Sequence, residues 1–217
     1  MPDPLQNPNR ERFDMIASGW DASPRRQELA AAVAEAIAVS VPLQPHWQAL
    51  EYGCGTGLVG ARLAPLLHRL LATDISPGML SVLAEKARDA GLRNVETRPL
   101  DLTRDPPPAD RFDLVFSSMT LHHIPDVPAL FRVFNGMIQP GGWIAVADLD
   151  AEDGTFHDAG VQGVAHHGFD RAVVAEWLRD AGFADIAVRA AHTVEKTRGN
   201  GLKRRYPVFL ATARRDA

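Results

Sequence analysis

Short apolar runs alternate along this chain with longer segments whose apolar residues recur at helical spacing. Runs bounded by polar residues are typical of buried strands, whereas a period near 3.6 residues indicates an amphipathic helix. We therefore expect strands at 47–52, 68–74, 94–101, 112–118 and 143–150, and helices at 26–39, 58–65, 77–91, 127–138 and 170–182. Such alternation is typical of a parallel sheet with helices on both faces.

The C-terminal part follows a different pattern. Apolar runs at 183–196 and 206–214 flank the stretch TRGNGLKRR, which leaves no room for a helix. Strands joined so directly are antiparallel. A turn is expected at QPGG, residues 139–142, before the fifth strand. The prediction is an α/β fold, a doubly wound, mostly parallel seven-stranded sheet with an antiparallel C-terminal hairpin.

The composition of the chain argues against several classes of protein. The chain has 217 residues with 46% hydrophobic and 23% charged content, a net charge of -4 and a pI near 6.0, so it shows no electrostatic signature of a nucleic-acid binder. Its short basic run, Lys203, Arg204 and Arg205, is interpreted as a solvated turn. A single cysteine excludes an internal disulfide, and no apolar run suggests a leader or a membrane span. We expect a cytoplasmic protein without membrane contact.

The stretch LEYGCGTGLVG, residues 50–60, has the clearest chemistry. Its glycines follow a strand and precede a helix, which places bare backbone amides beside a ligand. Read from Gly55, GTGLVG fits the dinucleotide pattern G-x-G-x-x-G, with Asp74 nineteen residues further on. If the strand ends at Tyr52, the pattern is instead E-x-G-x-G-x-G.

In that second register the loop, together with TDISPGM, PLDL, FDLVFSSMTLHHI and QPGGW, resembles the class I S-adenosylmethionine-dependent methyltransferases. The resemblance spans roughly residues 45–150 through five ordered motifs, which are specific for the superfamily and say little about the substrate. It implies a Rossmann-like methyltransferase fold, S-adenosyl-L-methionine as cofactor, and transfer of a one-carbon group. We divide the chain into an N-terminal lid and helix, 1–44, and a single methyltransferase domain, 45–217.

The resemblance places the cofactor at the carboxyl ends of the strands, as in other doubly wound sheets. It implies that Asp74 binds the ribose hydroxyls, that Asp101 binds the adenine edge and that Glu51 helps to hold the methionine ammonium. Each of these three also has a purely structural interpretation as a turn or strand-end carboxylate. The predicted cofactor residues are Glu51, Gly53, Cys54, Gly55, Gly57, Asp74, Ile75, Met79, Asp101, Leu102 and Ser117.

The acceptor is expected just past the fourth strand, where His122 and His123 are candidate general bases. Packing beneath the sheet is the alternative role for one of them. RFDMIASGWD resembles the family's N-terminal lid. The predicted substrate contacts are Phe13 and Trp20 in that lid, and Glu152, His157, His166 and His167 in an irregular stretch. No metal site is expected, because no rigid i, i+4 histidine pair is evident.

The sequence departs from the motifs of some known methyltransferase branches, and these departures narrow the range of possible acceptors. SSMT follows the fourth strand in place of the D/N-P-P-Y of nucleic-acid amino methyltransferases, and the one cysteine already lies in the glycine loop. A small-molecule acceptor is the prediction. A protein or RNA methyltransferase, a non-catalytic S-adenosylmethionine-binding module and a nicotinamide-dependent oxidoreductase remain alternatives. The sequence gives neither the attacking atom nor the oligomeric state.

Overall fold

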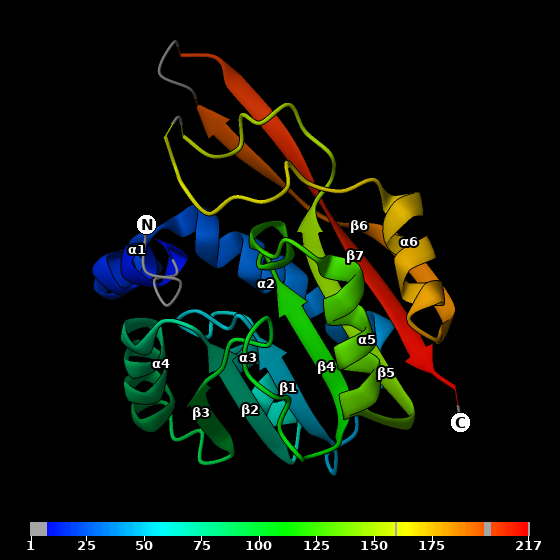
Figure 1. Cartoon of the computed structure of the whole chain (residues 1–217). Helices are drawn as coiled ribbons and strands as arrows, with labels where there is room; N and C mark the ends of the chain where they lie inside the picture. Colours follow the sequence, from blue (N-terminus) through cyan, green and yellow to red (C-terminus); the bar gives the residue numbers. More distant parts are fainter. Residues whose placement is uncertain (1–7, 159, 198–200, 217) are drawn as a thin grey trace.

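The computed structural model describes residues 8–158, 160–197 and 201–216, and its centre is a seven-stranded sheet in the order β3-β2-β1-β4-β5-β7-β6 (Figure 1). The strands are β1 (Gln48–Tyr52), β2 (Arg69–Asp74), β3 (Val95–Pro99), β4 (Phe112–Ser118), β5 (Ile138–Leu149), β6 (Phe183–Thr197) and β7 (Lys203–Arg215). The first five are parallel, and β7 runs antiparallel to both β5 and β6. The predicted doubly wound sheet with an antiparallel C-terminal hairpin is confirmed.

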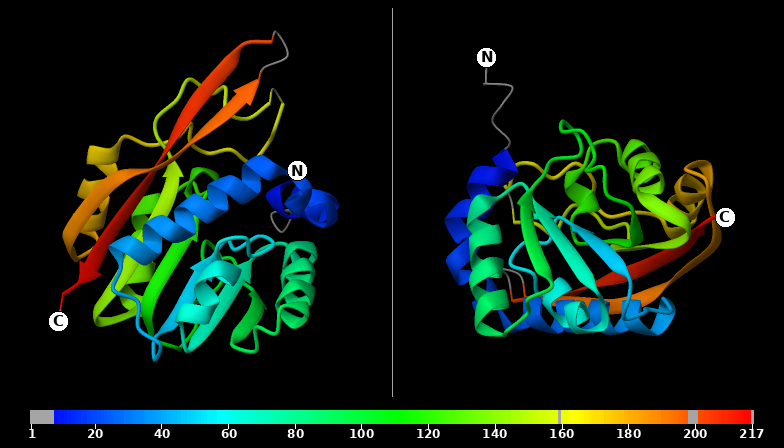
Figure 2. Two further views of the ribbon diagram at one scale, coloured as in Figure 1. Left: turned by 180° about the vertical axis from the view of Figure 1, so that it is seen from behind. Right: turned by 90° about the horizontal axis from the view of Figure 1, so that it is seen from below.

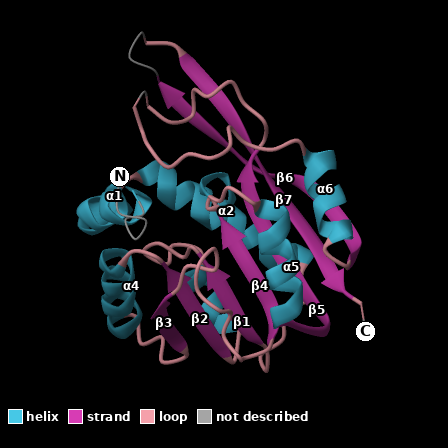
Figure 3. Ribbon diagram, in the orientation of Figure 1, coloured by secondary structure: helices cyan, strands magenta, loops and turns pink. Residues whose placement is uncertain are grey.

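Helices cover both faces of the sheet, as Figures 2 and 3 show. One apolar core joins the sheet to α2 (Pro24–Ser40), α3 (Gly60–Leu63) and α4 (Pro77–Asp89), and the other joins it to α5 (Val127–Met137) and α6 (Arg171–Asp180). Neighbouring strand residues alternate between the two cores, because successive side chains point to opposite faces; Ala49 lies in the first core and Leu50 in the second. No helix in the described part of the chain combines the length and apolar character needed to cross a bilayer.

Strand order reverses between β1 and β4, since β2 and β3 lie on one side of β1 and the later strands on the other. In doubly wound sheets this switch point opens a crevice beyond the carboxyl ends of the strands. The glycine loop follows β1, and the 3-10 turn η3 (Leu121–His123) follows β4. The topology therefore brings these two chemistry-bearing segments together.

Three local predictions differ from the structure. The basic run Lys203, Arg204 and Arg205, interpreted as a turn, forms the start of β7, although it is exposed. QPGG does not form a turn before the fifth strand but belongs to β5, which begins at Ile138. The pairing with β4 shifts between Phe112 and Leu114, and Gly141 has a φ of 77°, so a bulge absorbs the glycines. The helix predicted at 58–65 is only α3 followed by the 3-10 turn η2 (Ala64–Leu66), in which Pro65 lies. Residues 198–200 of the predicted hairpin turn lie outside the described residues.

The hairpin of β6 and β7 extends beyond β5. The last described pair of β5 with β7 is Leu149 with Val208, whereas β6 continues to pair with β7 as far as Thr197 with Lys203. Its outer part therefore stands past the sheet as a two-stranded arm (Figure 1).

Candidate functional site

The glycine loop needs its glycines for different reasons. Gly53, Gly55 and Gly57 have φ values of 70°, 53° and 74°, in the left-handed region that favours glycine. A Cβ at Gly53 would meet the Thr120 side chain and one at Gly57 the Leu83 side chain, whereas one at Gly55 would meet nothing within 4 Å. Gly55 is thus the position where the bare backbone faces open space.

Asp74 holds this loop from the end of β2. Its Oδ2 accepts a hydrogen bond from the Gly55 amide at 2.7 Å, and its Oδ1 accepts one from the Ser76 amide at 2.9 Å. The side chain is buried, yet it lines a cavity. Burial raises the pKa of Asp74, while these amides oppose the rise. The Asp74 carboxylate therefore holds the turn and also lines the cavity in which a ligand would bind.

Glu51 is the most unusual carboxylate of the site. Only 2% of the residue is exposed, and its Oε2 has no hydrogen-bond partner among the described residues. Burial raises the pKa of Glu51 to about 8, and the nearby Asp74 adds to the rise, while the Gly60 amide and Lys86 oppose it. A buried carboxyl oxygen without a partner, in a residue that lines a cavity, is costly unless a ligand or a proton completes it.

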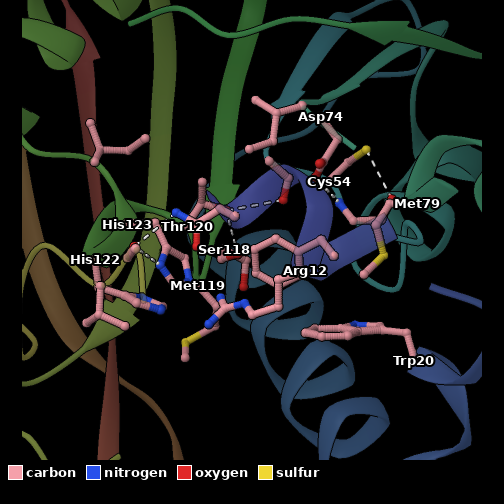
Figure 4. Close-up of a pocket in the computed structure, with 18 of the residues that line it drawn as sticks. Arg12, Trp20, Cys54, Asp74, Met79, Ser118, Met119, Thr120, His122 and His123 are labelled. Carbon is pink, nitrogen blue, oxygen red and sulfur yellow. Dashed lines mark hydrogen bonds between the residues drawn. The ribbon is translucent and has the colours of Figure 1, made fainter. Parts of the chain in front are cut away.

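The cavity has a volume of about 750 Å³, within the usual range for small-molecule sites. In Figure 4, Asp74 and Met79 lie on one side of it, which we call the cofactor end, and His122 and His123 lie on the other, the acceptor end. The predicted residues that line it are Phe13, Trp20, Glu51, Gly53, Cys54, Gly55, Asp74, Ile75, Met79, Asp101, His122, His123 and His157. Predicted residues outside the lining are Gly57, Leu102, Ser117, Glu152, His166 and His167.

Three of the predicted residues that do not line the cavity pack beneath its cofactor end. Ser117 is fully buried and its hydroxyl donates to the Tyr52 carbonyl at 2.8 Å, so the next residue, Ser118, faces the cavity instead. Leu102 belongs to the core beside α5. Gly57 packs against the α4 side chain Leu83. The cavity-facing residue of β4 is displaced by one position, because side chains alternate along a strand.

The other three predicted residues that do not line the cavity lie in the segment that follows β5. Glu152 Oε2 accepts hydrogen bonds from the amides of Thr155 and Phe156, at 2.6 and 3.0 Å. His166 Nε2 lies 2.9 Å from the Ile124 carbonyl oxygen, and the His167 side chain is 62% exposed. The structure thus gives these predicted substrate contacts loop-holding or surface positions.

The cofactor end is partly apolar. Met79 is buried at the start of α4, where its amide donates to the Ser76 hydroxyl that caps the helix. Asp101 lines the cavity, but its Oδ1 also accepts from the Thr103 amide and hydroxyl, at 3.0 and 2.5 Å. Burial raises the pKa of the Cys54 thiol, which fits a small apolar group better than a nucleophile.

At the acceptor end each histidine of η3 has a fixed orientation. His122 Nδ1 lies 2.7 Å from Asp148 Oδ1, and His123 Nδ1 lies 2.8 Å from the Gly163 carbonyl oxygen. Both acceptors require Nδ1 to carry a proton, so in the neutral ring the lone pair is on Nε2. Burial, followed by the charge of His122, lowers the pKa of His123 to about 3.

His157 joins this pair, and one ring nitrogen from each of His122, His123 and His157 lies within 4.8 Å of the others. Three imidazoles of this kind could hold a transition metal. Nitrogens at zinc-ligand distance from one ion would be about 3.4 Å apart, so these rings would have to close. Arg12 and Lys196 lie near enough to lower the pKa of His157, so a dication would meet positive charge there. The expectation of no metal remains a prediction.

The N-terminal segment covers the cavity. It comprises α1 (Pro8–Ile16) and the 3-10 turn η1 (Ala17–Ala22), and Phe13 and Trp20 from it meet edge to face at 5.6 Å. Asp14 Oδ1 accepts from the Ser76 hydroxyl and the Gly78 amide, at 2.6 and 2.8 Å. Asp21 binds Thr56 Oγ1 and Lys86 Nζ, each at 2.5 Å. Two carboxylates therefore fasten this segment to the glycine loop and α4.

Sequence reasoning missed several of these residues. Asp14 and Asp21 lie in the predicted lid but had no visible partner, and Lys196 and Arg12 join the cavity from distant parts of the chain. Asp148 had a usable signal, because it lies near the carboxyl end of a strand.

Comparison with known proteins agrees with this site. Residues 49–142 match a methyltransferase domain family. A ubiquinone biosynthesis O-methyltransferase of Xanthomonas axonopodis pv. citri is 30% identical, over 79% of this chain and 78% of that one. The DhpI complex with S-adenosylhomocysteine has a TM-score of 0.74 at 25% identity and covers 96% of both chains. This chain belongs to the class I S-adenosylmethionine-dependent methyltransferases.

Other relatives are longer. A phosphoethanolamine N-methyltransferase of Arabidopsis thaliana is 32% identical over 66% of this chain, but over only 30% of its own length. The chain spans less than half the length of several relatives that it matches. Family membership therefore leaves the acceptor open.

Proposed function

We propose that this chain transfers a methyl group from S-adenosylmethionine to a small-molecule acceptor. The observation that carries the proposal is Glu51, whose Oε2 is buried and lacks a partner in the described part of the chain, at the wall of a cavity beside a bare glycine backbone. The ligand that best completes such a carboxylate is a cation such as the methionine ammonium.

The remaining groups of the cofactor end fit the same ligand. Each Asp74 oxygen accepts one amide hydrogen bond and has lone-pair capacity for a ribose hydroxyl. Gly55 leaves space for close approach of a ligand to the backbone. Ile75 and Met79 offer apolar surface to a purine ring. The donor set and its shape thus support binding of this cofactor.

When bound, the cofactor supplies an electrophilic methyl group on a sulfonium sulfur. The chain contributes positioning, because an acceptor held close and in line reacts much faster than one in solution. A hydroxyl or amine acceptor must also lose a proton, and Nε2 of His122 or His123 is the base proposed for it. Asp148 acts as a positioning residue by fixing the His122 ring and its tautomer.

A small acceptor fits the enclosure better than a macromolecule. The N-terminal segment is fastened over the cofactor end, and the acceptor end lies among half-buried and buried histidines rather than on an open surface. The phosphoethanolamine N-methyltransferase among the relatives is named for a small acceptor, which supports the same interpretation.

Titration calorimetry with S-adenosylhomocysteine and with NAD tests the cofactor. We expect binding of the first and none of the second. Asp74→Ala should weaken S-adenosylhomocysteine binding at least about tenfold, because charge-assisted hydrogen bonds are lost. Asp89→Ala, at the exposed end of α4, is the control. Binding of NAD without binding of S-adenosylhomocysteine would overturn the proposal.

A further inference from the structure

The acceptor end of the cavity gathers nitrogen donors from distant parts of the chain. Arg12 comes from α1, the histidine pair from η3, His157 from the segment after β5, and Lys196 from β6. In Figure 4 the Arg12 guanidinium extends toward the side of His122 and His123, away from Asp74.

Arg12 is held beside these rings by aromatic contacts. Its guanidinium lies 4.6 Å from the centre of the Phe13 ring, and that ring meets the His123 ring at 5.7 Å. One Arg12 nitrogen, Nη1, donates to the Gln162 carbonyl at 3.4 Å. The Nε atom is buried and has no hydrogen-bond acceptor among the described residues. At least one guanidinium nitrogen of this cavity-lining residue is therefore left unsatisfied.

His157 presents a second unsatisfied nitrogen. Its Nε2 is buried without a hydrogen-bond partner in the described ranges, and its ring lies 5.1 Å from that of His122. Burial, then the charges of His122, Arg12 and Lys196, lowers the pKa of His157 to about 4. Arg12 and Lys196 thus place two cationic side chains in the lining beside this ring.

The carboxylates around the cavity are engaged elsewhere or exposed. Glu51, Asp74 and Asp101 belong to the cofactor end, and Asp158 lines the acceptor end but is exposed. Asp148 is fully buried and is paired with His122. An incoming anion would therefore meet an excess of donors, whereas a metal dication would be repelled by Arg12.

We infer that the acceptor carries an anionic group, a phosphate, phosphonate or carboxylate, that binds Arg12 and His157. The inference rests on the proposed function and names the class of its substrate. Arg12 would offer the planar donor edge that matches such oxyanions, and His157 Nε2 would supply a second donor. Lys196, whose Nζ donates to the Phe156 carbonyl, adds positive charge. Anchoring the acid at these residues leaves the acceptor's hydroxyl or amine toward the histidine pair.

Anion binding to the full chain saturated with S-adenosylhomocysteine tests the inference. The probes are sodium phosphate and sodium acetate, titrated by calorimetry against sodium chloride at matched ionic strength. We expect saturable binding of phosphate or acetate at one site. Arg12→Gln and His157→Gln should each weaken it at least about tenfold, because a charge-assisted or buried hydrogen bond is lost. Arg10→Gln, an exposed arginine of the same helix, should leave it unchanged.

The outcomes separate the two proposals. If the wild-type chain binds S-adenosylhomocysteine but neither anion more than chloride, the anionic acceptor is wrong and the cofactor proposal stands. Equal anion affinity in Arg12→Gln, His157→Gln and Arg10→Gln also overturns it. If S-adenosylhomocysteine itself does not bind, the proposed function fails. Unchanged S-adenosylhomocysteine affinity in the variants shows that each is folded.

Discussion

His122 Nδ1 and Asp148 Oδ1 lie 2.7 Å apart, with side-chain exposures of 2% and 0%. Asp148 also accepts the His122 backbone amide at 3.2 Å through its other oxygen. Although burial alone would raise the pKa of Asp148, the His122 imidazole holds it below its ordinary value. This pair joins β5 to the turn after β4 and fixes which imidazole nitrogen faces the cavity.

Asp148→Asn should therefore slow methyl transfer without weakening the cofactor site. An asparagine can turn its amide toward Nδ1 and stabilise the wrong tautomer, so we expect kcat to fall by roughly 10²-fold or more. S-adenosylhomocysteine affinity, measured by calorimetry, should stay within about twofold of wild type. A lost affinity together with a lowered Tm would show that Asp148 serves the fold instead.

A histidine base predicts a distinct pH signature. If the acceptor is a hydroxyl or an amine, replacing the active histidine, His122 or His123, by Ala should cost roughly 10²- to 10⁴-fold in rate. Because burial lowers the pKa of His123 to about 3, a base at His123 leaves no acidic limb between pH 5 and 9. His167→Ala is the matched control, because that ring is exposed and outside the cavity lining. Rates measured from pH 5 to 9 decide it. Unchanged rates and profiles in both variants would leave the two rings as packing groups.

Glu51 should make the free protein less stable as pH rises. Its pKa is about 8 in the folded chain against an ordinary 4.5, so between these values the folded state keeps a proton that the unfolded state releases. The free energy of unfolding should fall across this window, and Glu51→Gln should remove that fall, a difference of roughly a few kcal/mol near pH 8. Urea unfolding at pH 5 and 8.5, with Glu85→Gln as an exposed control, measures it.

Parallel stability curves for wild type and Glu51→Gln would contradict this account of Glu51. A second readout is independent of unfolding. If the ionised carboxylate binds an ammonium, S-adenosylhomocysteine affinity should rise with pH up to about 8 in the wild type and stay flat in Glu51→Gln.

Release of the cofactor should depend on Asp21. Its carboxylate binds both the glycine-loop residue Thr56 and Lys86 of α4, so Asp21→Ala removes two contacts that close the N-terminal segment. We expect S-adenosylhomocysteine to dissociate roughly tenfold faster. Stopped-flow fluorescence can follow it, because Trp20 lines the cavity. Glu11→Gln is the exposed acidic control, and equal dissociation rates in both variants would exclude a closing role.

Sequence patterns predicted those residues of the candidate site whose positions depend only on the strand, turn and helix in which they lie. The glycine loop and Asp74 follow directly from strand, turn and helix signals, and both lie where a doubly wound sheet binds ligands. Ser118 lines the cavity whereas the predicted Ser117 packs beneath it, because a shift of one residue reverses which side chain faces the cavity. The pairing of His122 with Asp148 spans 26 residues, and no pattern in either segment indicates its partner.

Arg12 marks the limit of such reasoning. It lies in a polar N-terminal stretch among other arginines, and Arg10 on the same helix is exposed. Only the packing of α1 against the rest of the chain decides which of these side chains enters the cavity. Charge near an active site that depends on such tertiary packing cannot be predicted from spacing alone.

The two-stranded arm of β6 and β7 contributes to the acceptor pocket, whereas other strands carry the cofactor site. Val194 and Lys196 of this arm line the cavity, and Tyr206 packs against Phe156 at 5.3 Å. The register that holds the sheet together is fixed by the inner half of β7, against β5. Changes of length or composition in the arm can therefore remodel the pocket for a new acceptor while the cofactor cradle, built on β1 and β2, stays intact.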